Sequence, residues 1–283
     1  MKHLLNIPFI DNKEKLYVNN VISSGWLSLN GTHTKIFENK FAKYLGVSYS
    51  LAVQSGTAAL HVALKSIDIK KDDKIIVPNY TCVSNISVLS QLLAKPVIID
   101  IEKETFGLDA ELVEKAIKKY KPKAVQLVHV YGFPARDTIK IKNLCKKYKI
   151  FLIEDASEAL GAKIGKKKIG SFGDISTFSI RSEKMIGVGE GGVITTNTRS
   201  IAEKAKLIAS RYAPFRTKKD PYWKKYFCSG EGYNYLMPHL LGAVARAQIE
   251  KFDKKILVKK IKIGKLYREI FTQNENYKIL QFE

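Results

Sequence analysis

Between residues 49 and 155 the chain alternates between two kinds of segment. Short apolar runs rich in Val and Ile, such as "KIIVP", "PVIID" and "IFLIED", have the length and composition of buried strands. The segments between these runs, such as "DAELVEKAIKKY", have apolar residues at helical spacing. This alternation predicts an α/β fold, with a mostly parallel central sheet flanked by helices on both faces. Ligands of such sheets bind beyond the carboxyl ends of the strands.

The pattern changes after residue 157. The runs "DISTFSI" and "GGVITTN" are separated by about ten residues, too few for a crossover helix, so we expect them to pair antiparallel or through a tight excursion. The stretch "RYAPFRTKKDPYWKKYFCSGEGYNY" has the composition of a long aromatic and basic loop. A long helical pattern with one break follows from His239.

The chain is strongly basic, with a formal net charge of +21. Such a charge is compatible with nucleic-acid binding, with attraction of an anionic substrate, or with solvated lysine-rich helix faces. Only seven of the 48 basic residues are arginine, the residue best suited to two-point contacts with phosphates and bases. We therefore expect no nucleic-acid partner.

The sequence has no apolar run of membrane-spanning length, and its first residues lack the apolar core of a signal peptide. We therefore expect no membrane association and a cytoplasmic location. The three cysteines, Cys82, Cys145 and Cys228, are too few and too widely spaced for a disulfide framework or a zinc site. We expect buried free thiols and no bound metal.

Three short stretches contain the residues most suited to chemistry. Ser55–Thr57 in "QSGTAALHVAL" opens an amphipathic helix, and its free N–H groups could bind a phosphate or form an ordinary N-cap. Asp155 ends a buried strand, where it could hold a cation, a metal or a protonated ring nitrogen, or cap the next segment. Lys184 follows a strand ending at Ser179, and is either a surface-loop lysine or a buried amine that forms a Schiff base.

Taken together, these stretches match the three reactive ends of pyridoxal phosphate. The helix start would hold the phosphate, Asp155 the ring nitrogen and Lys184 the aldehyde. The glycines of "GVGEGG" after Lys184 would then leave room for the cofactor against the backbone.

Five blocks of sequence resemble, in order and spacing, the signature of the DegT/DnrJ/EryC1/StrS sugar aminotransferase family, with most similarity to its perosamine-synthase-like branch. They are "SGTAAL", "VHVYGFPARD", "IEDASEALGA", "GSFGDISTFSIRSEKMIGVGEGGVITTN" and "GYNYLMPHLLGAVARAQIEK". The resemblance covers essentially the whole chain. It implies the fold type I of pyridoxal-phosphate-dependent transferases. A large cofactor-binding domain would occupy residues 1–250, and residues 251–283 would form the helical start of an incomplete small C-terminal domain.

The resemblance also implies roles for particular residues. Lys184 and Asp155 would be catalytic, with Lys184 forming the Schiff base and Asp155 keeping the ring nitrogen protonated. Glu158 would lie near the ring hydroxyl, whereas His129 is expected to be structural. The implied cofactor contacts are Gly56, Thr57, Asp155, Glu158, Ser179, Lys184 and Asn234. Asn234 would reach the phosphate from the neighbouring subunit of a homodimer with shared active sites.

The implied substrate contacts are Trp26 and Ser28 in the sugar pocket, with Arg211 and Arg216 beside the diphosphate. The implied reaction moves an amino group from an amino acid, glutamate by resemblance, to a nucleotide-linked keto-sugar. Such a reaction would serve cell-surface polysaccharide or related amino-sugar biosynthesis.

Two alternatives stay open. One is a pyridoxamine-dependent sugar dehydratase of the same fold, in which the Schiff-base lysine is replaced, often by histidine; the presence of Lys184 argues against it. The other is a non-catalytic ligand-binding relative. The chain also departs from the family pattern at Cys82, where many members have an aromatic ring stacked on the cofactor, and Tyr80 is a candidate substitute.

Overall fold

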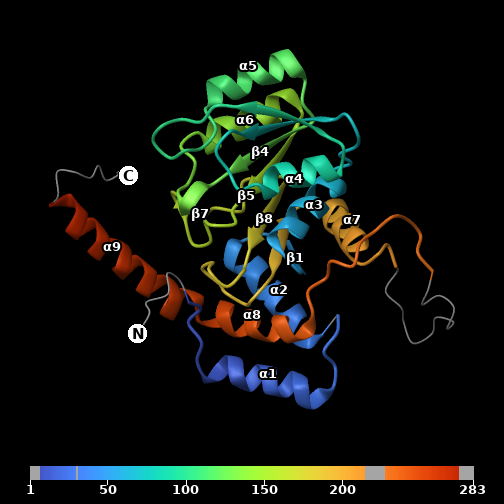
Figure 1. Cartoon of the computed structure of the whole chain (residues 1–283), viewed down its shortest axis with the longest axis vertical. Helices are drawn as coiled ribbons and strands as arrows, with labels where there is room; N and C mark the ends of the chain where they lie inside the picture. The colour runs from blue at the N-terminus through green and yellow to red at the C-terminus, as the bar shows by residue number, and fades with distance from the viewer. Residues whose placement is uncertain (1–6, 30, 214–226, 274–283) are drawn as a thin grey trace.

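The computed structural model describes residues 7–29, 31–213 and 227–273 (Figure 1). Within these ranges, seven strands form one sheet in the order β1-β9-β8-β5-β4-β2-β3. The strands are β1 (Tyr49–Val53), β2 (Lys74–Pro78), β3 (Lys95–Ile99), β4 (Ala124–Val128), β5 (Phe151–Asp155), β8 (Ile175–Ser179) and β9 (Gly192–Thr196). A separate small hairpin consists of β6 (Lys163–Ile164) and β7 (Lys167–Lys168).

The sheet is mostly parallel, as predicted. Neighbouring strands from β3 to β8 pair in parallel, whereas β9 pairs antiparallel with both β8 and β1. The antiparallel pairing of β8 and β9 confirms the first of the two arrangements expected for these runs. It leaves Ser179 opposite Gly192, so that the loop between them, which contains Lys184, leaves and re-enters the same edge of the sheet.

Helices cover both faces of the sheet (Figure 1). The helices are α1 (Asn12–Ser24), α2 (Thr32–Leu45), α3 (Gly56–Ser66), α4 (Ser84–Gln91), α5 (Ala110–Tyr120), α6 (Thr138–Tyr148), α7 (Arg199–Ala209), α8 (His239–Lys251) and α9 (Val258–Thr272). Successive side chains of a strand point to opposite faces of the sheet, so alternate residues belong to different hydrophobic clusters. Ile75 and Val77 pack with the α3, α4 and α7 side chains, whereas Ile76 packs with those of α5 and α6.

Helix α3 differs from the expectation of an amphipathic helix. Every residue from Ala58 to Leu64 is buried. The reason is that α3 packs on the sheet at β8 and β9 and also contacts α7 and α4. Its N-terminus is nevertheless built as expected, because Ser55 is the N-cap and its hydroxyl accepts a hydrogen bond from the Ala58 N–H at 3.0 Å.

The helical pattern after His239 is interrupted by a π-helical turn over Phe252–Leu257, which agrees with the predicted break. Helix α8 packs against α1 and α2. Helix α9 buries none of its residues and extends away from the sheet (Figure 1). Within the described residues, we find no helix with the length and apolar character needed to cross a membrane.

Candidate active site

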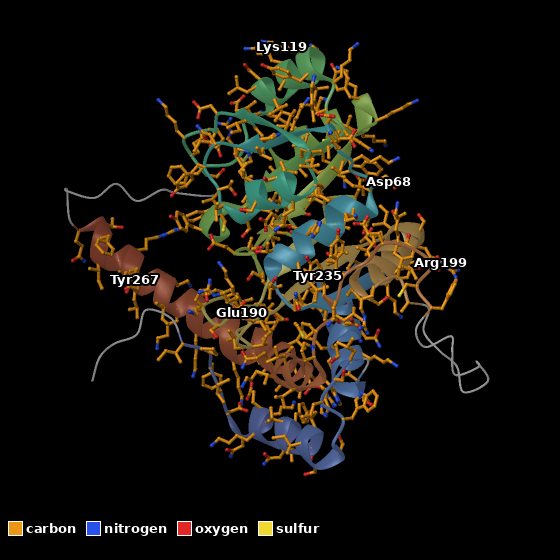
Figure 2. The ribbon with its side chains drawn as sticks, turned by 45° about the vertical axis from the view of Figure 1, so that its right-hand side comes forward. Asp68, Lys119, Glu190, Arg199, Tyr235 and Tyr267 are labelled. Carbon is orange, nitrogen blue, oxygen red and sulfur yellow. The ribbon has the colours of Figure 1, made fainter. Side chains whose placement is uncertain are left out.

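A cavity of about 420 Å³ lies at the carboxyl ends of β4, β5 and β8, beside the start of α3. The six cofactor contacts expected from this chain's own subunit all line it: Gly56, Thr57, Asp155, Glu158, Ser179 and Lys184. Glu190, labelled in Figure 2, lines the cavity from the loop that joins β8 to β9. Residues 134 positions apart in the sequence, Gly56 and Glu190, therefore meet in one place, where parallel sheets bind ligands.

At one end of the cavity, the first turn of α3 lies very close to the end of β8. A Cβ atom on Gly56 would lie 2.9 Å from the Ser179 Cβ, which is too close for any larger residue without a shift. The Thr57 hydroxyl lies 3.1 Å from the Ser84 hydroxyl. The backbone N–H groups at the start of α3 and the hydroxyl groups of Thr57, Ser84 and Ser179 thus line one end of the cavity. Such a group of donors suits a phosphate.

Asp155 is 4% exposed and ends β5. Its two carboxylate oxygens accept hydrogen bonds from the Asn85 side chain at 2.8 Å and from the Ser157 N–H at 3.1 Å. Both donors are neutral, and no lysine, arginine or histidine of the described residues forms an ion pair with Asp155. A buried carboxylate without a cation in the protein suits a ligand that brings one, such as a protonated ring nitrogen.

Lys184 differs from the solvated lysines of the helix faces. Its side chain is 20% exposed, and its Nζ donates to Glu158 Oε1 at 2.8 Å. The other Glu158 oxygen accepts from the Tyr131 N–H, also at 2.8 Å. Tyr131 has a φ of 51° and Gly132 a φ of 87°, and a Cβ on Gly132 would lie 2.9 Å from the Glu158 carbonyl oxygen. This tight turn therefore holds Glu158, and Glu158 holds the Lys184 amine in the cavity.

The glycines after Lys184 have a different role from the one expected. Cβ atoms on Gly187, Gly191 and Gly192 would meet protein atoms at 2.5, 2.7 and 2.2 Å respectively, and Gly189 has a φ of 100°. The expectation that they leave room for the cofactor was wrong for Gly187, Gly191 and Gly192, because other parts of the protein occupy that space, whereas Gly189 is required by its backbone conformation. They allow the loop to pack closely, which fixes the position of Lys184.

His129 lines the cavity, but its hydrogen bonds agree with the expected structural role. It is 1% exposed; its Nδ1 accepts from the Ala135 N–H at 3.0 Å, and its Nε2 lies 3.1 Å from Glu154 Oε1. Burial by itself would raise the pKa of Glu154, but the His129 contact and the N–H groups of Gly170 and Gly173 hold that pKa below its ordinary value. Both nitrogens of the imidazole are therefore used by the protein itself.

The expectation of buried thiols was wrong for two of the three cysteines. Cys145 is buried, whereas Cys82 and Cys228 are exposed free thiols. Cys82 lies in the loop before α4, where it lines the cavity together with Tyr80. The Tyr80 hydroxyl lies 2.9 Å from the Tyr131 hydroxyl, and both residues line the cavity and are exposed. The sequence did not single out Tyr131, although the glycine that follows it, shortly after a buried strand, is a turn signal.

Of the five other expected contacts, four lie outside this cavity and one is not among the described residues. Asn234 is exposed and forms a β-bridge with Ser210, and Arg211 is exposed; Arg216 lies outside the described residues. Trp26 and Ser28 are exposed in the segment before α2. The roles of these residues stay predictions.

His239 fixes that segment to the start of α8. Its N–H donates to the Ser28 carbonyl at 2.8 Å, and its Nδ1 lies 2.8 Å from the Trp26 carbonyl. Its Nε2 accepts from the His33 N–H at 3.2 Å, so Nδ1 carries the hydrogen and donates it to Trp26.

The fold and the cavity together define a pyridoxal-phosphate-dependent aminotransferase as the class of protein. The chain belongs to the DegT/DnrJ/EryC1/StrS aminotransferase family, whose model matches residues 8–283. Enzymes of this family depend on pyridoxal phosphate.

Curated and structural relatives agree with this family. The chain is 38% identical over 261 residues to GDP-perosamine synthase of Vibrio cholerae, covering 92% of this chain and 68% of that protein. It superposes with a TM-score of 0.88 and 26% identity on PseC, a Helicobacter pylori aminotransferase involved in pseudaminic acid biosynthesis, covering 97% and 72% of the two chains. A GDP-4-keto-6-deoxymannose-3-dehydratase has a TM-score of 0.81 and 26% identity, covering 89% and 68%. The chain thus spans about two thirds of the length of these relatives.

Proposed function

We propose that the protein transfers an amino group from an amino acid, glutamate, to a nucleotide-linked keto-sugar. The observation that supports this most directly is Lys184 in one cavity with a buried, cation-free Asp155 and the N-terminus of α3. These are the three contacts that the ends of pyridoxal phosphate need. The GDP-perosamine synthase relatives point to a GDP-linked sugar as the acceptor. The proposal includes a homodimer, a cytoplasmic location and a role in polysaccharide biosynthesis.

The described residues fit pyridoxal phosphate at each end. The N–H groups of Gly56 and Thr57 and the Ser179 hydroxyl would hold the phosphate. Asp155 would accept a hydrogen bond from the ring N–H. When bound, the cofactor withdraws electrons from the carbon whose C–H bond breaks.

The protein's own part in the reaction is to move one proton and to orient the reacting groups. Lys184 Nζ is the base that takes the proton from the donor's α-carbon and later returns a proton to the sugar carbon. Glu158 accepts a hydrogen bond from Nζ and so keeps the amine in the cavity between these steps. Asp155 keeps its negative charge beside the ring nitrogen, and its burial excludes water from that contact.

A dehydratase reaction on the same substrate class is the second candidate, because a dehydratase is among the structural neighbours. The resemblance associates that reaction with a histidine in place of the lysine. Lys184 therefore favours amino transfer.

The proposal is tested by trapping the cofactor on its lysine. The purified protein is incubated with pyridoxal phosphate, reduced with borohydride, digested and mapped by mass spectrometry. We expect a pyridoxyl group on Lys184, and its loss in Lys184→Ala together with all amino transfer from glutamate to a GDP-linked keto-sugar. A protein that never takes up the cofactor would contradict the proposal, and product lacking an amino group would favour the dehydratase.

A further inference from the structure

Behind the cavity, a chain of buried amides leads to Asp155. Asn85 on α4 and Gln126 on β4 are both fully buried. The Gln126 Nε2 donates to Asn85 Oδ1 at 3.0 Å, and the Asn85 Nδ2 donates to Asp155 Oδ2 at 2.8 Å. The same Asn85 nitrogen lies 3.0 Å from the Thr81 hydroxyl. Side chains of α4, β4 and β5, three elements far apart in sequence, are therefore linked in one hydrogen-bonded chain that ends at the Asp155 carboxylate.

The direction of these hydrogen bonds is fixed. An amide has its oxygen and its nitrogen on opposite sides, so the bond from Gln126 to the Asn85 oxygen turns the Asn85 nitrogen toward Asp155. A neutral N–H donor stabilises a carboxylate without cancelling its charge. Asp155 therefore keeps its orientation and its full negative charge for a cation in the cavity.

The one lysine in the cavity lining does not compete for this charge. Lys184 Nζ pairs with Glu158 Oε1 instead, at 2.8 Å. Two carboxylates of the lining thus have separate partners: Glu158 holds the amine of Lys184, and Asp155, held by neutral donors, is left for a ligand.

The amide oxygen of Gln126 also indicates that this side chain serves to orient Asn85. Its Oε1 is buried and has no hydrogen-bond partner among the described residues. A buried, unpaired carbonyl oxygen destabilises a protein, and an apolar residue of similar size would avoid it. An apolar residue could not, however, donate a hydrogen bond to Asn85 as the Gln126 Nε2 does.

We propose that Asn85, oriented by Gln126, is a positioning residue that directs the Asp155 carboxylate at the ring nitrogen of the cofactor. The inference rests on the proposed function, since the ring nitrogen belongs to pyridoxal phosphate. It adds a residue that the sequence did not single out, because "NYTCVSN" gives no sign that its asparagine reaches a strand end 70 residues away.

The test compares two ligands that differ in one atom. The apoprotein is titrated with pyridoxal phosphate and with its 1-deaza analogue, in which C–H replaces the ring nitrogen. Both ligands have the same phosphate and aldehyde, so a general loosening of the site weakens both equally. We expect Asn85→Leu to reduce the preference for pyridoxal phosphate over the analogue by about tenfold or more.

Asn79→Leu is the matched control. Asn79 donates to Asp100 at 2.9 Å in the same kind of amide–carboxylate contact, but on the surface and outside the cavity lining. This variant should keep the wild-type preference. Asn85→Ser retains a short donor and should retain part of the preference, and Gln126→Leu should reduce it in the same direction as Asn85→Leu.

The outcomes separate the inference from the proposed function. An unchanged ligand preference in Asn85→Leu, or in Gln126→Leu and Asn85→Ser if Asn85→Leu does not fold, overturns the positioning role while leaving the aminotransferase proposal intact. A wild-type protein that binds neither ligand overturns the proposed function and the inference together.

Discussion

Gly56 sets how closely the first turn of α3 approaches the end of β8. Since a Cβ at this position would lie 2.9 Å from Ser179 Cβ, we expect Gly56→Ala to push the two elements apart. The variant should lower the free energy of unfolding by about 1–3 kcal/mol. It should also weaken pyridoxal phosphate binding, because the N–H groups of α3 and the Ser179 hydroxyl no longer converge. Urea unfolding and cofactor titration measure the two effects.

Gly264 provides the control for this substitution. It lies within α9, and a Cβ there would have no atom within 4 Å. Gly264→Ala should raise stability by about 0.5–1 kcal/mol, because alanine favours a helix, and should leave cofactor binding unchanged. Equal cofactor affinity in Gly56→Ala and the wild type would show that the close approach is not needed for binding.

The three thiols differ in reactivity. Burial raises the pKa of the Cys145 thiol to about 12, so this residue is a neutral, inaccessible thiol at pH 8. Cys82 and Cys228 are exposed. We expect iodoacetamide to modify Cys82 and Cys228 in the native protein and to leave Cys145 intact, as measured by peptide mass mapping.

Pyridoxal phosphate should protect only one of these thiols. Cys82 lines the cavity, so bound cofactor should slow its modification severalfold, whereas Cys228 does not line the cavity and should react at the same rate. Equal rates at Cys82 with and without cofactor would mean that the cofactor lies elsewhere.

Lys184 illustrates what can be predicted for single residues. Its sequence context leaves two interpretations open, and a second and third stretch were needed to favour the chemical one. The contacts that hold it could not be predicted, since Glu158 and Tyr131 reach it only through the tertiary fold. Asn85 could not be predicted for the same reason.

At the scale of whole elements, Glu250 joins α8 to α1. Its carboxylate accepts from the Tyr17 hydroxyl at 3.0 Å and contacts Lys13 Nζ at 2.5 Å and Arg246 Nε at 3.0 Å. Burial by itself would raise the Glu250 pKa, but these partners lower it from the ordinary 4.5 to about 2. The contacts therefore stabilise the fold fully above pH 4.5 and lose this effect as the pH falls from 4.5 toward 2.

Glu250→Gln should remove this acid sensitivity. We expect the variant to lose about 2 kcal/mol at pH 7, measured by urea unfolding, and its deficit relative to the wild type to shrink below pH 4.5. Glu231→Gln is the control: Glu231 pairs with Lys65 but is 77% exposed, so solvent screens the pair and this substitution should cost much less stability than Glu250→Gln. A constant deficit at every pH would show that charge is not what Glu250 contributes.

The alternating pattern of residues 49–155 predicted five strands of the sheet, and the two apolar runs after residue 157 predicted β8 and β9. The strand order could not be predicted, since pairing is decided by contacts distant in sequence. Helices α1 and α2 lie outside the alternating pattern and were not predicted. The burial of α3 was missed because α7, which packs against it, comes from residues 199–209, far away in the sequence.

At the scale of the whole molecule, the charge of +21 is not concentrated at the cavity. The cavity lining has four carboxylates and two cationic side chains: Asp155, Glu158, Glu183, Glu190, Arg181 and Lys184. Lys119 on α5 and Arg199 on α7 lie at the outer edges of the molecule, well away from Glu190 (Figure 2). The cavity of a single chain therefore lacks the excess of cations that a cofactor phosphate and a nucleotide diphosphate would favour.

A second subunit would supply further contacts, as the family resemblance implies for Asn234. Asn234 is exposed and does not line the cavity of its own chain, which leaves it available to another. We expect Lys184→Ala and Asn234→Ala to be inactive separately, and a mixture of the two, unfolded and refolded together, to recover activity. In each mixed dimer one site has an intact Lys184 and an intact Asn234, and the other site has neither. Random pairing then gives about a quarter of wild-type activity. No recovery, in a mixture shown by mass spectrometry to contain mixed dimers, would place Asn234 and Lys184 in the same subunit's site.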